Sequence, residues 1–97
     1  MAVGDMIADI QSIAAAAYLD VQPSGTVEAV IHNIWHEDDI TISRYDGTNV
    51  VALPKIVGAG LESNLQIHVG NTDRIRVQNN HASAAKLIGY DGMVTHT

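Results

Sequence analysis

Two histidines four residues apart come closer than any other residues of this chain to the spacing of metal ligands on a helix. On a helix, His32 and His36 would face the same way and could bind one zinc ion together. Their neighbours are rich in Val and Ile, and Asn33 stands where a zinc-protease motif has glutamate. This composition is typical of a strand, in which four residues span about 13 Å. We therefore expect the two rings to share a strand face without sharing an ion, and we predict no metal and no cofactor.

Two other groupings of polar residues could carry chemistry. The acidic run Glu37–Asp39 could contribute to a calcium site, but a dedicated calcium loop alternates its carboxylates around a glycine. We interpret the run as a solvated turn. A hydrolytic triad could draw on four residues: His68, His81, Asp73 and Ser83. No serine of the chain stands in a Gly-x-Ser-x-Gly elbow, so we predict that the protein is not an enzyme.

Phosphate and nucleic-acid binding are also disfavoured. The loop Gly58–Gly60 lacks the Gly-Lys-Ser/Thr ending of a phosphate-binding loop, and we interpret it as a flexible connection. Nucleic-acid binding needs a basic stripe, whereas the formal net charge here is −6. The five basic residues are Arg44, Lys55, Arg74, Arg76 and Lys86. We predict no nucleic-acid partner, and the acidity also disfavours an anionic membrane surface.

Three residues are candidates for an interface. Arg74 and Arg76 stand two apart on an expected strand and so share one face. They could bind an acidic partner surface, or they could pair with Asp or Glu across the sheet. Trp35 is the only tryptophan and could anchor either an interface or the core.

The length and composition describe one small domain of 97 residues, 46% of them hydrophobic. A domain of this size leaves about a third of its unfolded-chain surface exposed, so self-association would bury more. Without Phe, and with one Trp, branched aliphatic residues must form the core, which favours strands. The chain has no cysteine, and small secreted domains often depend on disulfides, so an intracellular or assembled protein is the better interpretation.

The first 15 residues have a different pattern from the rest. Four apolar residues fall at helical spacing: Met6, Ile7, Ile10 and Ile13. We predict an arm or short helix over residues 1–15 that becomes ordered against a partner, with a frayed terminus as the alternative. The β-domain is expected over residues 16–97. No basic residue precedes the first apolar stretch and no apolar run approaches about 20 residues, so we predict neither a signal peptide nor a membrane span.

Alternating apolar and polar residues dominate the rest of the chain. The tripeptide Tyr-Asp-Gly occurs at 45–47 and at 90–92, and Asp-Gly is a strong hairpin-turn signal. Strand patterns run over residues 17–22, 26–35, 40–43, 49–53, 64–69, 74–78, 86–90 and 93–96. About eight short strands with regular turns predict an all-β fold: a small β-sandwich, a jelly-roll-like domain or a barrel.

Four short runs resemble the small, β-rich virion proteins of tailed bacteriophages. They are Tyr-Leu-Asp-Val-Gln-Pro at 18–23, Val-Ile-His-Asn-Ile at 30–34, Arg-Tyr-Asp-Gly at 44–47 and Leu-Ile-Gly-Tyr-Asp-Gly at 87–92. The resemblance implies a non-catalytic capsid decoration (cement) protein, which is made in the host cytoplasm and lies on the capsid surface of the virion. It also implies a homotrimer that binds and stabilises the major capsid protein shell. An N-terminal arm would contact the shell, which adds Met6, Ile7, Ile10 and Ile13 to the interface candidates.

Two other functions stay open at this point. One is a phage tail or surface adhesion module that binds host glycans through exposed Tyr or Trp. The other is a small jelly-roll enzyme that uses histidine ligands.

Overall fold

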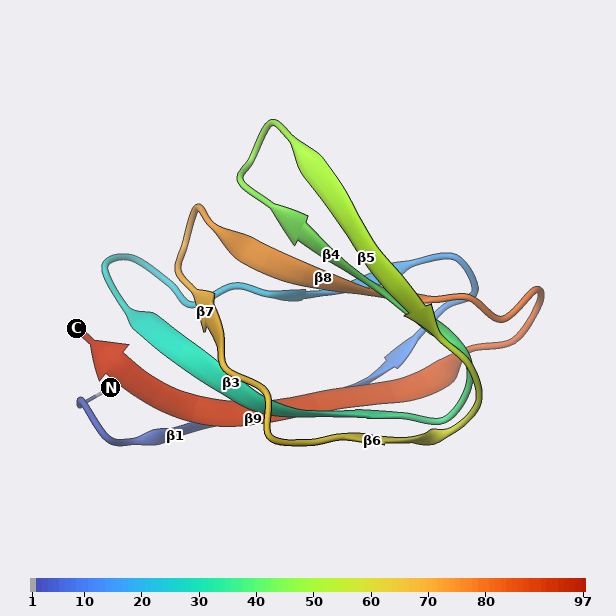
Figure 1. Ribbon diagram of the computed structural model, residues 1–97, viewed down its shortest axis with the longest axis horizontal. Helices are drawn as coiled ribbons and strands as arrows, with labels where there is room; N and C mark the ends of the chain where they lie inside the picture. Colours follow the sequence, from blue (N-terminus) through green and yellow to red (C-terminus); the bar gives the residue numbers. More distant parts are fainter. Residues whose placement is uncertain (1) are drawn as a thin grey trace.

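Two antiparallel β-sheets pack face to face in this protein (Figure 1). The computed structural model describes residues 2–97, apart from the side chains of residues 53 and 54. Sheet A has the order β1 (Met6–Ile13), β9 (Lys86–His96), β3 (Glu28–His36) and β6 (Gly60–Glu62), and β7 (Ile67–Val69) also pairs with β3. Sheet B has the order β2 (Tyr18–Val21), β8 (Arg74–Asn79), β4 (Ile40–Tyr45) and β5 (Val50–Ile56). The predicted all-β class is confirmed, and the β-sandwich is the alternative that the chain adopts.

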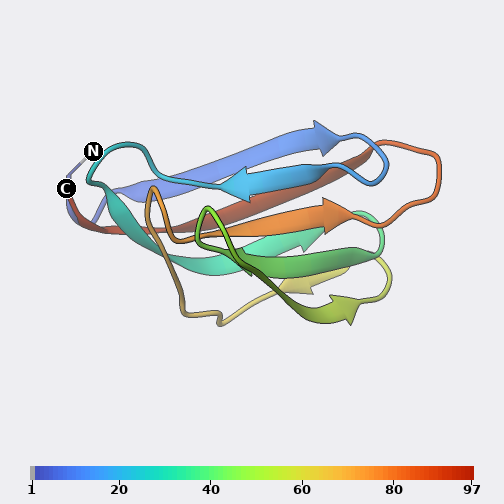
Figure 2. The same ribbon diagram turned by 90° about the horizontal axis from the view of Figure 1, so that it is seen from above.

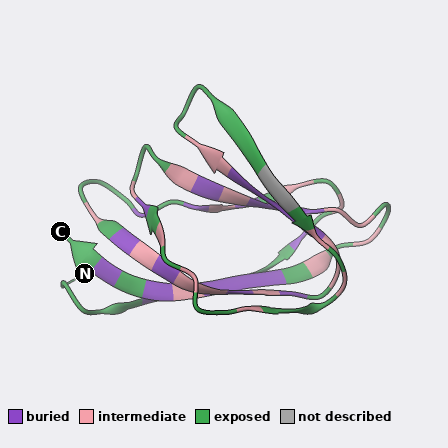
Figure 3. Cartoon of the chain, viewed as in Figure 1, coloured by how far each residue is buried: buried purple, intermediate pink, exposed green. Residues whose placement is uncertain are grey.

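The core lies between the sheets and consists of branched aliphatic side chains. β1, β3 and β9 of sheet A and β2 and β8 of sheet B run roughly along the long axis of the molecule, as in the aligned type of sheet packing (Figure 2). Buried positions alternate with less buried ones along β8 and along most of β3 (Figure 3). The largest fully buried apolar side chains are Ile31, Ile34, Ile40, Ile75, Ile88, Val21, Val77 and Val94. This is the core that the lack of phenylalanine predicted.

The helix predicted near the N-terminus is wrong, because residues 6–13 form β1. This strand pairs with β9 along its whole length, from Met6 opposite Met93 to Ile13 opposite Lys86. Ile7 and Ile13 point into the core, whereas Met6 and Ile10 are exposed. An isolated helix this short is marginal in water, whereas pairing with β9 satisfies the backbone and buries two isoleucines. Residues 6–13 are therefore part of sheet A and not an arm separate from the β-domain.

The first Tyr-Asp-Gly sequence forms the predicted turn, between β4 and β5. Asp46 Oδ1 accepts hydrogen bonds from the backbone N–H of Thr48 at 2.9 Å and of Asn49 at 2.6 Å. Gly47 has φ +95°, a conformation that side chains with a Cβ rarely adopt. These backbone hydrogen bonds also hold the pKa of Asp46 below its usual value.

The second Tyr-Asp-Gly sequence does not form a turn, and the hairpin predicted there is wrong. Residues 90–92 lie in the middle of β9, which is continuous for 11 residues. Gly92 is needed here for close approach, because a Cβ at this position would overlap the carbonyl oxygen of Val30 on β3. The same dipeptide, Asp-Gly, thus serves a turn in one sheet and a tight strand contact in the other.

The segment interpreted as a flexible loop at residues 57–61 contributes a short strand. β6 pairs with β3 through Trp35 opposite Leu61 and His36 opposite Gly60. The described residues form nine strands, one more than predicted, and no helix. Within residues 2–97 there is also no helix long and apolar enough to cross a membrane.

Candidate functional site

A β-bulge in β3 separates the two histidines that could have formed a metal site. Ile31 pairs with Gly92 and Asn33 pairs with Asp91, so His32 is an extra residue without a partner on β9. The bulge shifts the alternation of the strand by one residue. His36 therefore points into the core while His32 is half-buried, and the prediction that the rings share one face is wrong. Within residues 2–97, no group of three or more His, Cys, Asp or Glu residues could hold a metal ion.

His36 is a buried polar contact between β3 and β6. Its Nδ1 lies 3.0 Å from the carbonyl oxygen of Asp38, and its Nε2 lies 3.0 Å from Glu62 Oε2. Both ring nitrogens face oxygen atoms. Both contacts can be hydrogen bonds only if each nitrogen carries a proton, or if Nδ1 carries one and the Glu62 carboxyl group carries the other. The ring thereby joins β6 to the end of β3, which gives it a structural role.

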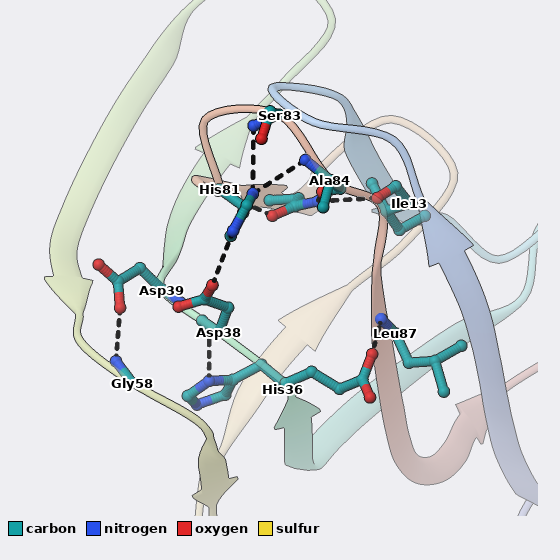
Figure 4. A network of polar contacts seen from close by, with 11 residues as sticks. Ile13, His36, Asp38, Asp39, Gly58, His81, Ser83, Ala84 and Leu87 are labelled. Carbon is teal, nitrogen blue, oxygen red and sulfur yellow. Dashed lines mark hydrogen bonds and ion pairs between the residues drawn. The ribbon is translucent and has the colours of Figure 1, made fainter.

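The acidic run holds neighbouring loops in place (Figure 4). Glu37 Oε1 accepts the backbone N–H of Leu87 at 2.6 Å, and Asp39 Oδ1 accepts the backbone N–H of Gly58 at 2.6 Å. Asp38 Oδ2 lies 3.7 Å from His81 Nε2. The pKa of Asp38 is lowered, first by the hydrogen bond from the backbone N–H of Asp39 and then by the charge of His81. These carboxylates make contacts within the chain, although Glu37 is also exposed to solvent.

The residues considered for a triad lie in different parts of the fold. His81 Nδ1 accepts the backbone N–H groups of Ser83 and Ala84, so it organises the loop between β8 and β9 (Figure 4). His68 and Asp73 instead line a cleft of about 460 Å³ beside the β7–β8 turn. That turn and the β8–β9 loop are at opposite ends of the sandwich (Figure 1). The structure does not bring the four residues together.

The outer face of sheet A carries several exposed apolar side chains. In an antiparallel sandwich the outward positions are usually polar. Here the outward side chains include Met6, Ile10, Val30, Trp35, Leu61, Leu87 and Met93, which we call the apolar face. Five of these seven side chains expose between 46% and 72% of their area. Exposed apolar side chains gathered on one face are typical of interaction surfaces.

The centre of the apolar face contains one polar pair and a shallow groove. Asn33 Nδ2 donates a hydrogen bond of 2.6 Å to Asp91 Oδ1 across β3 and β9. A groove of about 390 Å³ lies beside this pair, and both Met6 and Met93 line it. Ile10 covers Gly89, where an added Cβ would come within 2.6 Å of the isoleucine side chain.

The outer face of sheet B carries a compact group of charged and aromatic side chains. We call it the arginine–tyrosine cluster: Tyr18, Asp20, Tyr45, Arg74 and Arg76. Arg76 Nε donates to Asp20 Oδ1 at 2.9 Å, and Arg74 Nε lies 3.8 Å from Asp20 Oδ2. The Arg74 and Arg76 guanidinium carbons lie 4.6 and 4.0 Å from the centre of the Tyr45 ring. Of the two alternatives that the sequence left open for the arginines, the structure shows the pairing with an acid across the sheet.

The predicted interface residues thus fall into three groups. Met6, Ile10 and Trp35 belong to the apolar face. Ile7 and Ile13 are buried in the core and are not available to a partner. Arg74 and Arg76 lie on the opposite side of the sandwich. Sequence reasoning missed four residues of the apolar face, because their outward direction depends on strand pairing that no local pattern reveals: Val30, Leu61, Leu87 and Met93.

Comparison with known protein families finds no family model that matches this chain. Comparison with curated proteins finds no significant match.

Proposed function

We propose that this chain is a non-catalytic structural protein of a tailed-phage virion, and specifically a capsid decoration protein. The apolar face is the observation that carries the proposal. A domain with a complete core of its own gains nothing from a second apolar surface unless another protein covers it. The resemblance of four short runs to phage virion proteins supports the choice of the capsid as the assembly.

The chemistry of the apolar face favours contact between copies of this chain. The carboxylate at the centre of this face, that of Asp91, already accepts a hydrogen bond from Asn33. Two copies that each carry a formal charge of −6 repel one another through most surfaces. The repulsion is weakest where the facing surfaces are uncharged. We propose that this face forms the contacts of a homotrimer, and that the trimer bridges neighbouring major capsid subunits.

Many weak contacts then add up on a particle. Each trimer presents three identical binding surfaces, so that binding at one raises the effective concentration of the others. A small domain can stabilise a shell in this way without one tight site.

Glycan binding gains no support from a particular observation. A sugar-binding site needs open aromatic faces, and the Tyr45 ring is in contact with two guanidinium groups. Arg76 also lies 5.1 Å from the centre of the Tyr18 ring. Trp35 is half-buried within the apolar face.

The test mixes the purified chain with empty capsids built from the major capsid protein of the phage that encodes it. We expect saturable co-sedimentation with the capsids and a rise in their melting temperature. Ile10→Glu should remove both effects, because it places a charge on the apolar face without entering the core. Val57→Glu is the matched control, since Val57 is 82% exposed in a loop outside the apolar face. Failure of the unmodified chain to bind these capsids would reject the proposed function.

A further inference from the structure

The arginine–tyrosine cluster has more positive than negative charge. Two guanidinium groups share one carboxylate, that of Asp20. Lys55 adds a third cation to this face, because it pairs with the outward residue Thr41. The outer strand positions of sheet B are therefore net positive on a chain whose formal charge is −6.

Arg74 is the less well compensated of the two arginines. Its side chain is only 14% exposed, and its Nε is buried without a hydrogen-bond partner. The nearest carboxylate oxygen, on Asp20, is 3.8 Å away. Poorly compensated charge in a largely buried position is costly, and a second carboxylate beside the pair would reduce that cost.

The two arginines are also held in position before any partner arrives. The Tyr45 ring lies against both guanidinium groups, and the Tyr18 ring lies 5.1 Å from that of Arg76. Cation–π contacts of this kind restrict long side chains, so less rotamer freedom is lost when a ligand binds. A planar guanidinium group matches the two oxygens of a carboxylate better than it matches a point charge.

We propose that the outer face of sheet B is a docking surface for an acidic segment of a partner protein, whose carboxylates pair with Arg74 and Arg76. The occupant is inferred from charge complementarity, because this net-positive, aromatic-lined patch lies on a chain whose formal net charge is negative. Two arginines and one lysine do not form the extended basic stripe that nucleic acid requires. The proposal does not depend on the capsid as the partner.

A second copy of this chain is a poor occupant. Its most acidic run, Glu37–Asp39, already holds the backbone N–H groups of Leu87 and Gly58. Freeing those carboxylates for another molecule would break contacts with β9 and with the β5–β6 loop. The acidic segment therefore comes from a different protein.

The test titrates hexaglutamate peptide into the full chain, labelled with ¹⁵N, at low salt. We expect chemical-shift changes concentrated on the strands that carry the cluster, with Arg76→Gln weakening binding about tenfold. Asp20→Asn should strengthen binding, because it removes the carboxylate that competes for both arginines. A purely structural role for the cluster does not predict these opposite effects of two variants in one ion pair.

Lys86→Gln is the matched control, since it removes one positive charge from sheet A and should leave affinity nearly unchanged. The amide spectrum of each variant verifies that it is folded. The proposal would be overturned if Lys86→Gln and Arg76→Gln lowered the affinity for hexaglutamate equally. It would also be overturned if Asp20→Asn bound the peptide more weakly than the unmodified chain does. A tighter response to inorganic phosphate than to the peptide would overturn the choice of carboxylate. Loss of self-association in Arg76→Gln would identify a second copy of this chain as the occupant. That result would also contradict the proposal of a different partner protein.

Discussion

The side-chain amide of Asn79 on sheet B donates a hydrogen bond of 2.8 Å to the carbonyl oxygen of Ile13 on sheet A. Asn79 is completely buried. The same amide nitrogen donates to the carbonyl oxygen of Ala84 at 3.1 Å, and its Oδ1 accepts the backbone N–H of His81 at 2.9 Å. One side chain thus joins β8, the end of β1 and the β8–β9 loop. It fixes how the two sheets meet at this end of the sandwich.

Asn79→Ala should lower the free energy of unfolding by about 2–3 kcal/mol, because three backbone groups lose their partner and one of these hydrogen bonds is fully buried. Urea denaturation followed by circular dichroism measures this. Asn49→Ala is the control, since Asn49 is exposed in the β4–β5 turn and should change stability by less than about 0.5 kcal/mol. Equal effects of the two substitutions would show that the buried network does not contribute as described.

Gly92→Ala should prevent normal pairing of β3 with β9. A methyl group at this position would overlap the Val30 carbonyl oxygen and lie 2.9 Å from the Ile31 Cα, and neither backbone atom can move without disturbing the centre of sheet A. We expect a loss of about 3 kcal/mol or a failure to fold. Gly70→Ala tests the specificity of this effect, because its nearest neighbour would be the flexible Glu28 side chain at 3.7 Å. A stable Gly92→Ala protein would contradict the close approach.

The errors of the sequence interpretation have identifiable physical causes. The alternation of apolar and polar residues predicted most strands, because one face of each strand packs in the core and the other faces solvent. β1 escaped this pattern because both of its faces are apolar: Ile7 and Ile13 fill the core, while Met6 and Ile10 lie on the apolar face. Apolar residues on both faces of a strand produce helix-like spacings by coincidence. The outward apolar residues that place β1 on the apolar face thus also explain why the helix prediction is wrong.

The arginine pair was more predictable than the histidine pair. Arg74 and Arg76 occupy a regular stretch of β8, so their shared face followed from spacing alone. His32 is the extra residue of a bulge that lies before His36 and depends on how β3 pairs with β9. No residue near His32 signals that irregularity, since it arises from pairing with a strand more than 50 positions away.

Removing residues 2–13 should unfold the chain rather than leave a folded β-domain. The deletion strips two core isoleucines and exposes the edge of β9 over eight positions. We expect loss of dispersed amide signals in a ¹⁵N spectrum, together with aggregation. Removing residues 2–3 alone, which precede β1, serves as the control. A dispersed spectrum from the longer deletion would mean that β1 is dispensable and acts as an arm after all.

Stability should fall above about pH 10 because of Tyr90. Burial, and to a lesser degree the charge of Asp9, raise the pKa of Tyr90 above its usual value of 10.0. The unfolded chain therefore releases the Tyr90 proton at lower pH than the folded chain does. The contribution of Tyr90 to the free energy of unfolding is thus complete below pH 10 and is lost as pH rises through the higher folded pKa. Tyr90→Phe should flatten the decline in unfolding free energy between pH 10 and the folded pKa. From pH 7 to 9 the two proteins should give parallel curves, and an unchanged slope at high pH would contradict this assignment.

Trp35 provides a direct optical test of the apolar face, because it is the only tryptophan in the chain and lies on that face. If copies associate through the apolar face, its fluorescence maximum should move to shorter wavelength as protein concentration rises, since the indole becomes shielded from water. Met93→Glu should keep the emission at the monomer value at every concentration, because a charge opposite Met6 would be buried without a partner. Val57→Glu, with the same change of charge in an exposed loop, should follow the unmodified chain. Light scattering on the same samples decides whether a wavelength shift reflects association. A trimer that forms with no change in Trp35 emission would place the contact between copies on another surface.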